Sequence, residues 1–133
     1  METPTDIKLH KKSGVLGIEY ADGKSYEFSA EFLRVHSPSA EVKGHGPGQE
    51  TLQFGKKDVR IVKLDMVGNY AIKPTFSDGH TTGIFSWNYL CELGGNQDQL
   101  WTSYLARLNS AGKIREPLLE HTQVITLENH YQA

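Results

Sequence analysis

The fold is decided by residues 76–93, which have the sequence Phe-Ser-Asp-Gly-His-Thr-Thr-Gly-Ile-Phe-Ser-Trp-Asn-Tyr-Leu-Cys-Glu-Leu. They predict the end of a strand, an Asp-Gly turn, a short strand over 82–85 and a helix over 87–93 capped by Ser86. A shorter copy lies upstream at residues 20–33, with the sequence Tyr-Ala-Asp-Gly-Lys-Ser-Tyr-Glu-Phe-Ser-Ala-Glu-Phe-Leu. The same order of parts in both stretches predicts a domain built from two copies of one unit.

The first half of the chain predicts three strands and a short helix. Apolar and polar residues alternate over 7–11 and 15–20, and a third strand covers 25–28. The Asp-Gly pair at 22–23 predicts a type I′ hairpin turn, which needs positive φ at both central positions. Ser29 is expected to cap the short helix that follows.

The second half repeats this plan. Residues 59–64 carry apolar side chains on both faces, which predicts a strand near the centre of a sheet. In the next strand, 70–76, Pro74 cannot donate a hydrogen bond, so this strand should be an edge or contain a bulge. A last helix is expected between Asn96 and Gly112. Its apolar stripe consists of Leu100, Trp101, Tyr104, Leu105 and Leu108.

These elements predict one α+β domain over residues 5–112. Two strand-strand-strand-helix repeats would form two layers with approximate internal two-fold symmetry, followed by a C-terminal helix. Two small sheets facing each other as a sandwich are the alternative. Residues 113–133 are interpreted as a partly flexible extension, in which 124–127 could form a late strand or a docking segment.

Composition limits the classes of function. The 133 residues carry a formal net charge of −2, which argues against a nucleic-acid-binding protein. The chain has one cysteine, Cys91, so neither an internal disulfide nor a paired-cysteine zinc motif can form. The N-terminal residues lack the pattern of a signal peptide, and no apolar run is long enough to span a membrane. We therefore expect a cytoplasmic protein.

Histidines are the first candidates for chemistry. His80 follows the second Asp-Gly turn and could be a metal ligand or proton carrier, or an exposed turn residue like Lys24 in the first copy. His36 and His45 flank a loop rich in glycine and proline, and would join His80 only if that loop folded back. Trp87 and Tyr89 cannot share one face of a short helix, so an exposed Trp87 would indicate a partner surface.

Three segments carry a family resemblance: Leu-Arg-Val-His-Ser-Pro-Ser-Ala-Glu-Val at 33–42, Gly-His-Gly-Pro at 44–47, and residues 76–90. Together they resemble small bacterial proteins that are similar to the N-terminal domain of gamma-butyrobetaine hydroxylase. The resemblance covers roughly residues 5–95. It implies a compact α+β domain that in the hydroxylases precedes the iron and 2-oxoglutarate catalytic domain. Related domains are fused to Mrp-type iron–sulfur carrier ATPases, so this chain would be the accessory domain alone.

The resemblance also implies a place for a metal. In the hydroxylases three cysteines and a histidine hold zinc. The match puts Ser37, Ser39 and Val42 at the cysteine positions and His80 at the histidine. Because a neutral serine oxygen is a poor zinc ligand, replacement ligands would have to come from Glu41, His36 and His45, for iron or zinc.

We therefore predict a non-enzymatic accessory or adaptor module linked to iron or iron–sulfur metabolism. Its partner would be an iron–sulfur carrier ATPase or an oxygenase, by analogy with the family. The alternative is an iron- or zinc-binding protein that uses His80 with the loop histidines. The expected binding residues are Arg34, His36, Ser37, Ser39, Glu41, His45 and Trp87.

Overall fold

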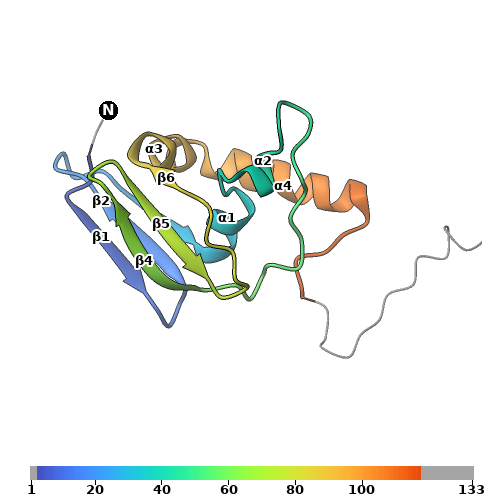
Figure 1. The fold of residues 1–133 in the computed structure, drawn as a ribbon, viewed down its shortest axis with the longest axis horizontal. Helices are drawn as coiled ribbons and strands as arrows, with labels where there is room; N and C mark the ends of the chain where they lie inside the picture. Colours follow the sequence, from blue (N-terminus) through green and yellow to red (C-terminus); the bar gives the residue numbers. More distant parts are fainter. Residues whose placement is uncertain (1–2, 118–133) are drawn as a thin grey trace, which may run out of the picture.

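The computed structural model describes residues 3–117, which form two three-stranded antiparallel sheets and four helices (Figure 1). The first sheet has the order β1 (Asp6–His10), β2 (Val15–Glu19), β3 (Ser25–Ser29). The second has the order β4 (Ile61–Val67), β5 (Ala71–Phe76), β6 (Phe85–Ser86). The predicted α+β class, with two groups of three strands, is confirmed.

A helix follows directly on the last strand of each sheet. The four helices are α1 (Ala30–Val35), α2 (Ala40–Lys43), α3 (Trp87–Gly95) and α4 (Gln97–Ala111). The predicted caps of α1 and α3 are confirmed, because Ser29 Oγ accepts from the Phe32 N–H at 3.0 Å and Ser86 Oγ from the Tyr89 N–H at 3.1 Å. Helix α2 was not predicted, since its four residues are too few to show an apolar period.

The two hairpin loops share one hydrogen-bond pattern. In each, the glycine N–H donates to the carbonyl three residues earlier, at 3.1 Å for Gly23 and 3.0 Å for Gly79. Only the glycine takes positive φ, +88° at Gly23 and +92° at Gly79, because no described non-glycine residue does. The predicted type I′ turn is therefore wrong. Both loops fit a three-residue connection that ends in a glycine.

The second sheet departs from the expected strands. Pairing of β5 with β6 covers only Ala71 with Ser86 and Ile72 with Phe85, so the strand predicted over 82–85 is wrong except at its last residue. Strand β5 is the central strand of this sheet, so the edge position expected from Pro74 is wrong, and the register shift lies in β4. Pro74 lies just beyond the pairing with β6 and has no N–H with which to extend it. Strand β4 is an edge strand and not central, with a bulge between Ile61 and Lys63.

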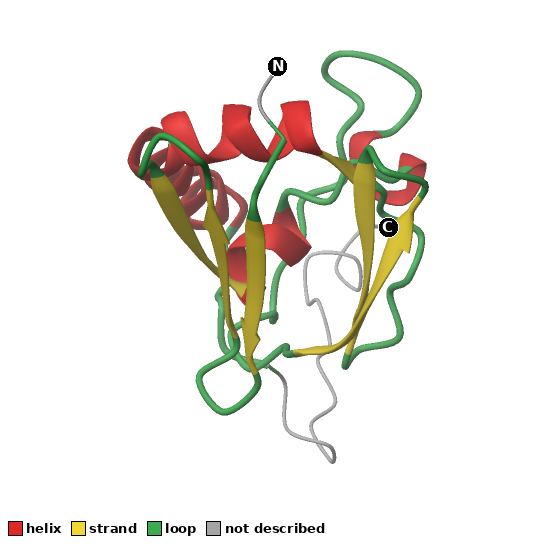
Figure 2. Ribbon diagram, turned by 90° about the vertical axis from the view of Figure 1, so that its left-hand side faces the viewer, coloured by secondary structure: helices red, strands yellow, loops and turns green. Residues whose placement is uncertain are grey.

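One core cluster joins the two sheets to α1 and α3. Leu16, Ile18 and Phe28 enter it from the first sheet, and Ile72, Phe76 and Phe85 from the second. Figure 2 shows the strands as two groups with helices across their upper ends. A smaller cluster around Tyr104 and Leu108 fixes α4, whereas Leu105 is exposed, so the apolar stripe of α4 is narrower than predicted.

The segment after α4 lies against the domain. Gly112 ends α4 in the left-handed conformation, as expected, with φ +67°. The Gly55 N–H donates to Ile114 O and the Lys57 N–H to Arg115 O, both at 3.0 Å. The strand considered for 124–127 lies outside the described residues. No helix in the described part of the chain is long and apolar enough to cross a membrane.

Candidate functional site

Two serines after α1 meet the histidine of the second hairpin. Ser37 Oγ lies 2.8 Å from His80 Nε2, and Ser39 Oγ lies 3.4 Å from the same atom. All three residues are buried, so the prediction of an exposed turn histidine is wrong. We call Arg34, Ser37, Ser39, Glu41, Asp78 and His80 the His80 cluster.

Local structure explains why this contact forms. Helix α1 ends after Val35, where the His36 N–H donates to Phe32 O. The chain then passes Pro38 and enters α2 after Ser39. Gly83 allows the close approach, because a Cβ built there would overlap Ser37 Oγ. A side chain at Gly83 would therefore separate Ser37 from its place beside His80.

Both ring nitrogens of His80 have partners. His80 Nδ1 lies 3.4 Å from Glu41 Oε2, while Thr82 Oγ1 donates to Glu41 Oε1 at 3.1 Å. Burial lowers the pKa of His80 and the charge of Arg34 lowers it further, although Glu41 and Asp78 act in the opposite direction. The neutral ring that results is best assigned with Nδ1–H donating to Glu41 and Nε2 accepting from Ser37.

Asp78 is the charged centre of the same cluster. It accepts from Arg34 Nε at 2.9 Å and from Lys56 Nζ at 2.6 Å, and its second oxygen accepts from the His80 N–H at 3.2 Å. Burial opposes its ionisation. The hydrogen bonds from Lys56 and His80 and the charge of Arg34 outweigh burial and lower the pKa to about 2. Gln53 also accepts from Arg34 Nη1, at 3.0 Å.

The side chains around His80 do not provide the ligands of the zinc site that the family resemblance implies. Ser37 and Ser39 offer neutral hydroxyls, and Val42, which is 5% exposed, offers only an apolar side chain. No group of three or more histidine, cysteine, aspartate or glutamate residues within residues 3–117 is arranged to hold a metal ion. Tetrahedral zinc needs thiolate, imidazole or carboxylate ligands. In the His80 cluster these types are the His80 imidazole and the carboxylates of Glu41 and Asp78, and Asp78 is already paired with Arg34 and Lys56.

The other predicted binding residues lie apart from this cluster. His36 is buried, and its Nδ1 is 2.8 Å from Phe32 O. It lines a separate cavity of about 440 Å³ with Lys43 and Tyr89. His45 is exposed in the loop after α2. Within the described residues no hydrogen bond joins either ring to His80, so the three-histidine arrangement is not formed.

Trp87 is a core residue and not a partner surface. It is 3% exposed, and its Nε1–H donates to Asn69 O at 2.8 Å. Tyr89 is the more exposed aromatic residue of α3, and its hydroxyl donates to His36 O at 2.6 Å. The two aromatic side chains therefore differ in exposure, as expected, but the tryptophan is the buried one.

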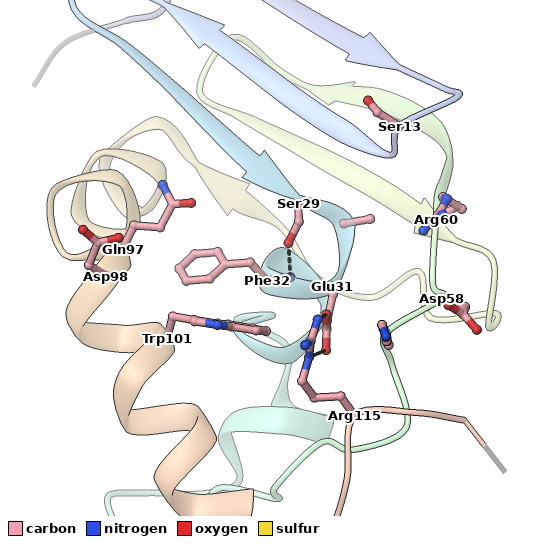
Figure 3. A pocket seen from close by; sticks show the side chains of 12 residues that line it. Ser13, Ser29, Glu31, Phe32, Asp58, Arg60, Gln97, Asp98, Trp101 and Arg115 are labelled. Atoms are coloured by element: carbon pink, nitrogen blue, oxygen red, sulfur yellow. Dashed lines mark hydrogen bonds and ion pairs between the residues drawn. The ribbon is translucent and has the colours of Figure 1, made fainter.

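A second charged pair, Glu31 with Arg115, was not predicted from the sequence. Glu31 is 5% exposed and receives two hydrogen bonds from Arg115, at 2.9 and 2.7 Å (Figure 3). The Arg115 guanidinium lies 5.1 Å from the Trp101 ring centroid, at a cavity of about 480 Å³. A single carboxylate in the apolar run Ala-Glu-Phe-Leu at 30–33 is the sequence signal that could have indicated a buried partner.

Comparison with known proteins places this geometry in context. The family model described as gamma-butyrobetaine hydroxylase-like, N-terminal, matches residues 7–91. A protein solved in solution by NMR is 49% identical, with a TM-score of 0.77, over 95% of this chain and 99% of its own. Another NMR structure is 46% identical, with a TM-score of 0.75, over 95% of both chains.

A crystal structure from Acidithiobacillus ferrooxidans is also similar. It is a protein of unknown function from the DUF971 family, 38% identical over 69% of this chain and 92% of its own, with a TM-score of 0.57. A search of curated proteins gives no match. The matches therefore support the family and the fold.

Proposed function

Because the chain belongs to the family of gamma-butyrobetaine hydroxylase-like N-terminal domains, we propose that it is a non-enzymatic accessory module that binds a protein of iron or iron–sulfur metabolism. The observation that carries this proposal is the closure of the His80 cluster. The His80 side chain is 3% exposed, and both ring nitrogens are engaged by other side chains. A serine hydroxyl that donates to a histidine can act as a nucleophile only where a substrate reaches it, and Ser37, at 0% exposed, is as closed to a substrate as His80.

The closed cluster makes a rigid support for the surface above it. Ser37 and Ser39 are tied to His80, and the Glu41 carboxylate, 65% exposed, is held by His80 and Thr82. A surface that is already ordered loses little conformational entropy on binding. We therefore expect the partner to contact the exposed Glu41 and Lys43 of α2 and the exposed His45 in the loop that follows it.

The class of partner follows from the family analogy. The resemblance described above connects such domains with iron–sulfur carrier ATPases and with iron- and 2-oxoglutarate-dependent oxygenases. Because α2 carries two exposed side chains of opposite charge, Glu41 and Lys43, a partner would need charges of both signs at the matching surface.

Calorimetric titration of the purified protein with a purified carrier ATPase, and separately with an oxygenase, tests this proposal. We expect saturable binding to one of them, weakened at least about tenfold by Glu41→Lys through charge repulsion. Glu50→Lys is the matched control, because Glu50 is exposed in the loop beyond α2. Absence of binding to both proteins, or equal weakening by both substitutions, would contradict the proposal.

A metal site built on His80 and Glu41 is the second candidate. It is favoured by one observation, the 3.4 Å between His80 Nδ1 and Glu41 Oε2, which are both metal-ligand types. Elemental mass spectrometry of untagged wild type, His80→Ala and Glu41→Gln separates the two candidates. Near-stoichiometric iron or zinc that is lost in both variants would replace the adaptor proposal. Glu41→Gln keeps the test valid if His80→Ala fails to fold.

A further inference from the structure

Strand β4 has a free edge. Among residues 3–117, β4 pairs with β5 alone, so its other side carries unpaired backbone groups. Such edges are usually shielded, because they offer a template for pairing with another strand. On β4, however, Val62 is 51% and Met66 61% exposed. On β1, the corresponding edge of the first sheet, the apolar residues are only partly exposed and pack against the core.

The sequence of β4 is complementary to itself. It runs Ile-Val-Lys-Leu-Asp-Met-Val from residue 61 to 67. If two copies are laid antiparallel with Leu64 at the two-fold axis, Lys63 of each lies opposite Asp65 of the other, and Val62 lies opposite Met66. A shift that centres Asp65 would instead oppose two carboxylates. Charge therefore selects the register centred on Leu64.

The charged residues form an exposed ion pair within the strand, which a second copy can reach. Lys63 and Asp65 lie two positions apart on one face of the strand, with Nζ and Oδ2 3.6 Å apart, and their side chains are 67% and 42% exposed. In the two-fold arrangement they would form a group of four alternating charges. The bulge between Ile61 and Lys63 lies outside the central pairs, so regular pairing is available over residues 63–65, where Lys63 meets Asp65 and Leu64 meets Leu64.

We propose that β4 is a self-association edge on which a second copy of this chain docks antiparallel around Leu64. The contact joins the β4-β5-β6 sheets of the two copies into one six-stranded sheet across the two-fold axis. A strand of seven residues buries much less than the ~800 Å² per partner of a standard interface, so the dimer is weak and forms at high protein concentration. This inference does not depend on the adaptor proposal.

A dilution series followed by two-dimensional amide NMR and sedimentation velocity tests the inference. Concentration-dependent shifts are expected at the amides of Leu64 and Met66. Lys63→Glu and Asp65→Lys each replace two attractive cross-strand pairs by two repulsive ones, so each should weaken self-association at least about tenfold. An equal mixture of the two variants should associate again, because the carboxylate introduced in one variant then faces the ammonium group introduced in the other.

Lys8→Glu on the edge strand β1 is the matched control, and it should leave self-association unchanged. Circular dichroism melting confirms that each variant is folded, which the exposure of Lys63 and Asp65 favours. A protein that stays monomeric up to about 1 mM, where even weak contacts associate, would overturn the proposal. So would a mixture that fails to restore association, or β4 amides already protected at high dilution, since another segment of the chain would then occupy the edge.

Discussion

Arg34 Nε lies 2.9 Å from Asp78 Oδ2, and this contact joins α1 to the second hairpin loop. The two residues are far apart in sequence, and Arg34 is only 7% exposed. Asp78 is therefore both a turn residue and the counter-ion of a buried guanidinium. A buried charge is tolerated when it is paired, so the pair should matter for stability more than an exposed ion pair does.

Replacing Asp78 by Asn should make the free energy of unfolding vary less with pH below pH 3.8. The pKa of Asp78 is about 2 in the folded protein against 3.8 ordinarily, so its contribution is present above pH 3.8 and is lost as the pH falls toward 2. At neutral pH we expect Asp78→Asn to cost about 1–2 kcal/mol after solvent screening. Urea unfolding at a series of pH values measures both effects.

Asp22→Asn is the control for this experiment. Asp22 occupies the matching place in the first loop, where its Oδ1 accepts from the Lys24 N–H at 3.0 Å, but its side chain is exposed. We expect a change within about 0.5 kcal/mol, as for most surface substitutions. Equal losses at both positions would mean that the turn, and not the pairing with Arg34, is what Asp78 stabilises.

His36 should destabilise the protein when it gains a proton. Burial lowers its pKa below 6.5, against the opposing hydrogen bond to Phe32 O, and the charges of Arg107 and Lys43 lower it further. The folded state binds this proton less readily than the unfolded state does. The contribution of neutral His36 to the free energy of unfolding is therefore fully present above pH 6.5 and is lost as the pH falls through the pKa of the folded state.

The substitution His36→Asn tests this dependence. The asparagine amide can take the place of Nδ1–H and donate to Phe32 O, but it does not titrate. The variant should therefore lose less stability than wild type as the pH falls below 6.5, at pH values above 3.8, where the protonation of Asp78 does not yet contribute. Identical slopes for the variant and wild type would contradict a neutral buried His36.

Two neighbouring glycines in α3 should respond oppositely to alanine. A Cβ at Gly94 would lie 2.5 Å from the Tyr26 ring, whereas a Cβ at Gly95 would have no atom within 4 Å. Gly94→Ala must displace Tyr26 and should cost about 1–3 kcal/mol. Gly95→Ala should stabilise the helix by up to about 1 kcal/mol. Thermal unfolding distinguishes the two, and a similar change in both would argue against close packing at Tyr26.

Arg115→Ala should leave a buried carboxylate without its partner. Glu31 is 5% exposed, and Arg115 supplies two hydrogen bonds to it. We expect a loss of about 2–4 kcal/mol in urea unfolding, below the upper range for buried pairs because Arg115 is partly exposed.

The double variant Glu31→Gln/Arg115→Ala is the decisive comparison. Removing both charges should recover part of the stability lost in Arg115→Ala, because no unpaired carboxylate then remains buried. Lys113→Ala, which removes a cation from the same segment, should have a smaller effect. A double variant that is no more stable than Arg115→Ala would mean that Arg115 acts through packing on Trp101.

The sequence by itself determined the local structure of this protein. The caps at Ser29 and Ser86 and the αL end of α4 at Gly112 depend on residues within a few positions of one another. The repeated order of strands and helix was also visible, since alternation and turn residues are short-range signals. The same local rules could not choose between a type I′ turn and the longer loop, because both use Asp-Gly.

Which distant residues come into contact depends on the packing of the whole domain. The burial of His80, its contact with Ser37 and the position of β4 at a sheet edge depend on how the two sheets and α1 pack. Gly94 and Gly95 are adjacent in α3, and they differ in packing because Tyr26 lies against Gly94. Such contacts join residues tens of positions apart, and their energy comes from burial and charge pairing that no neighbouring residue reveals.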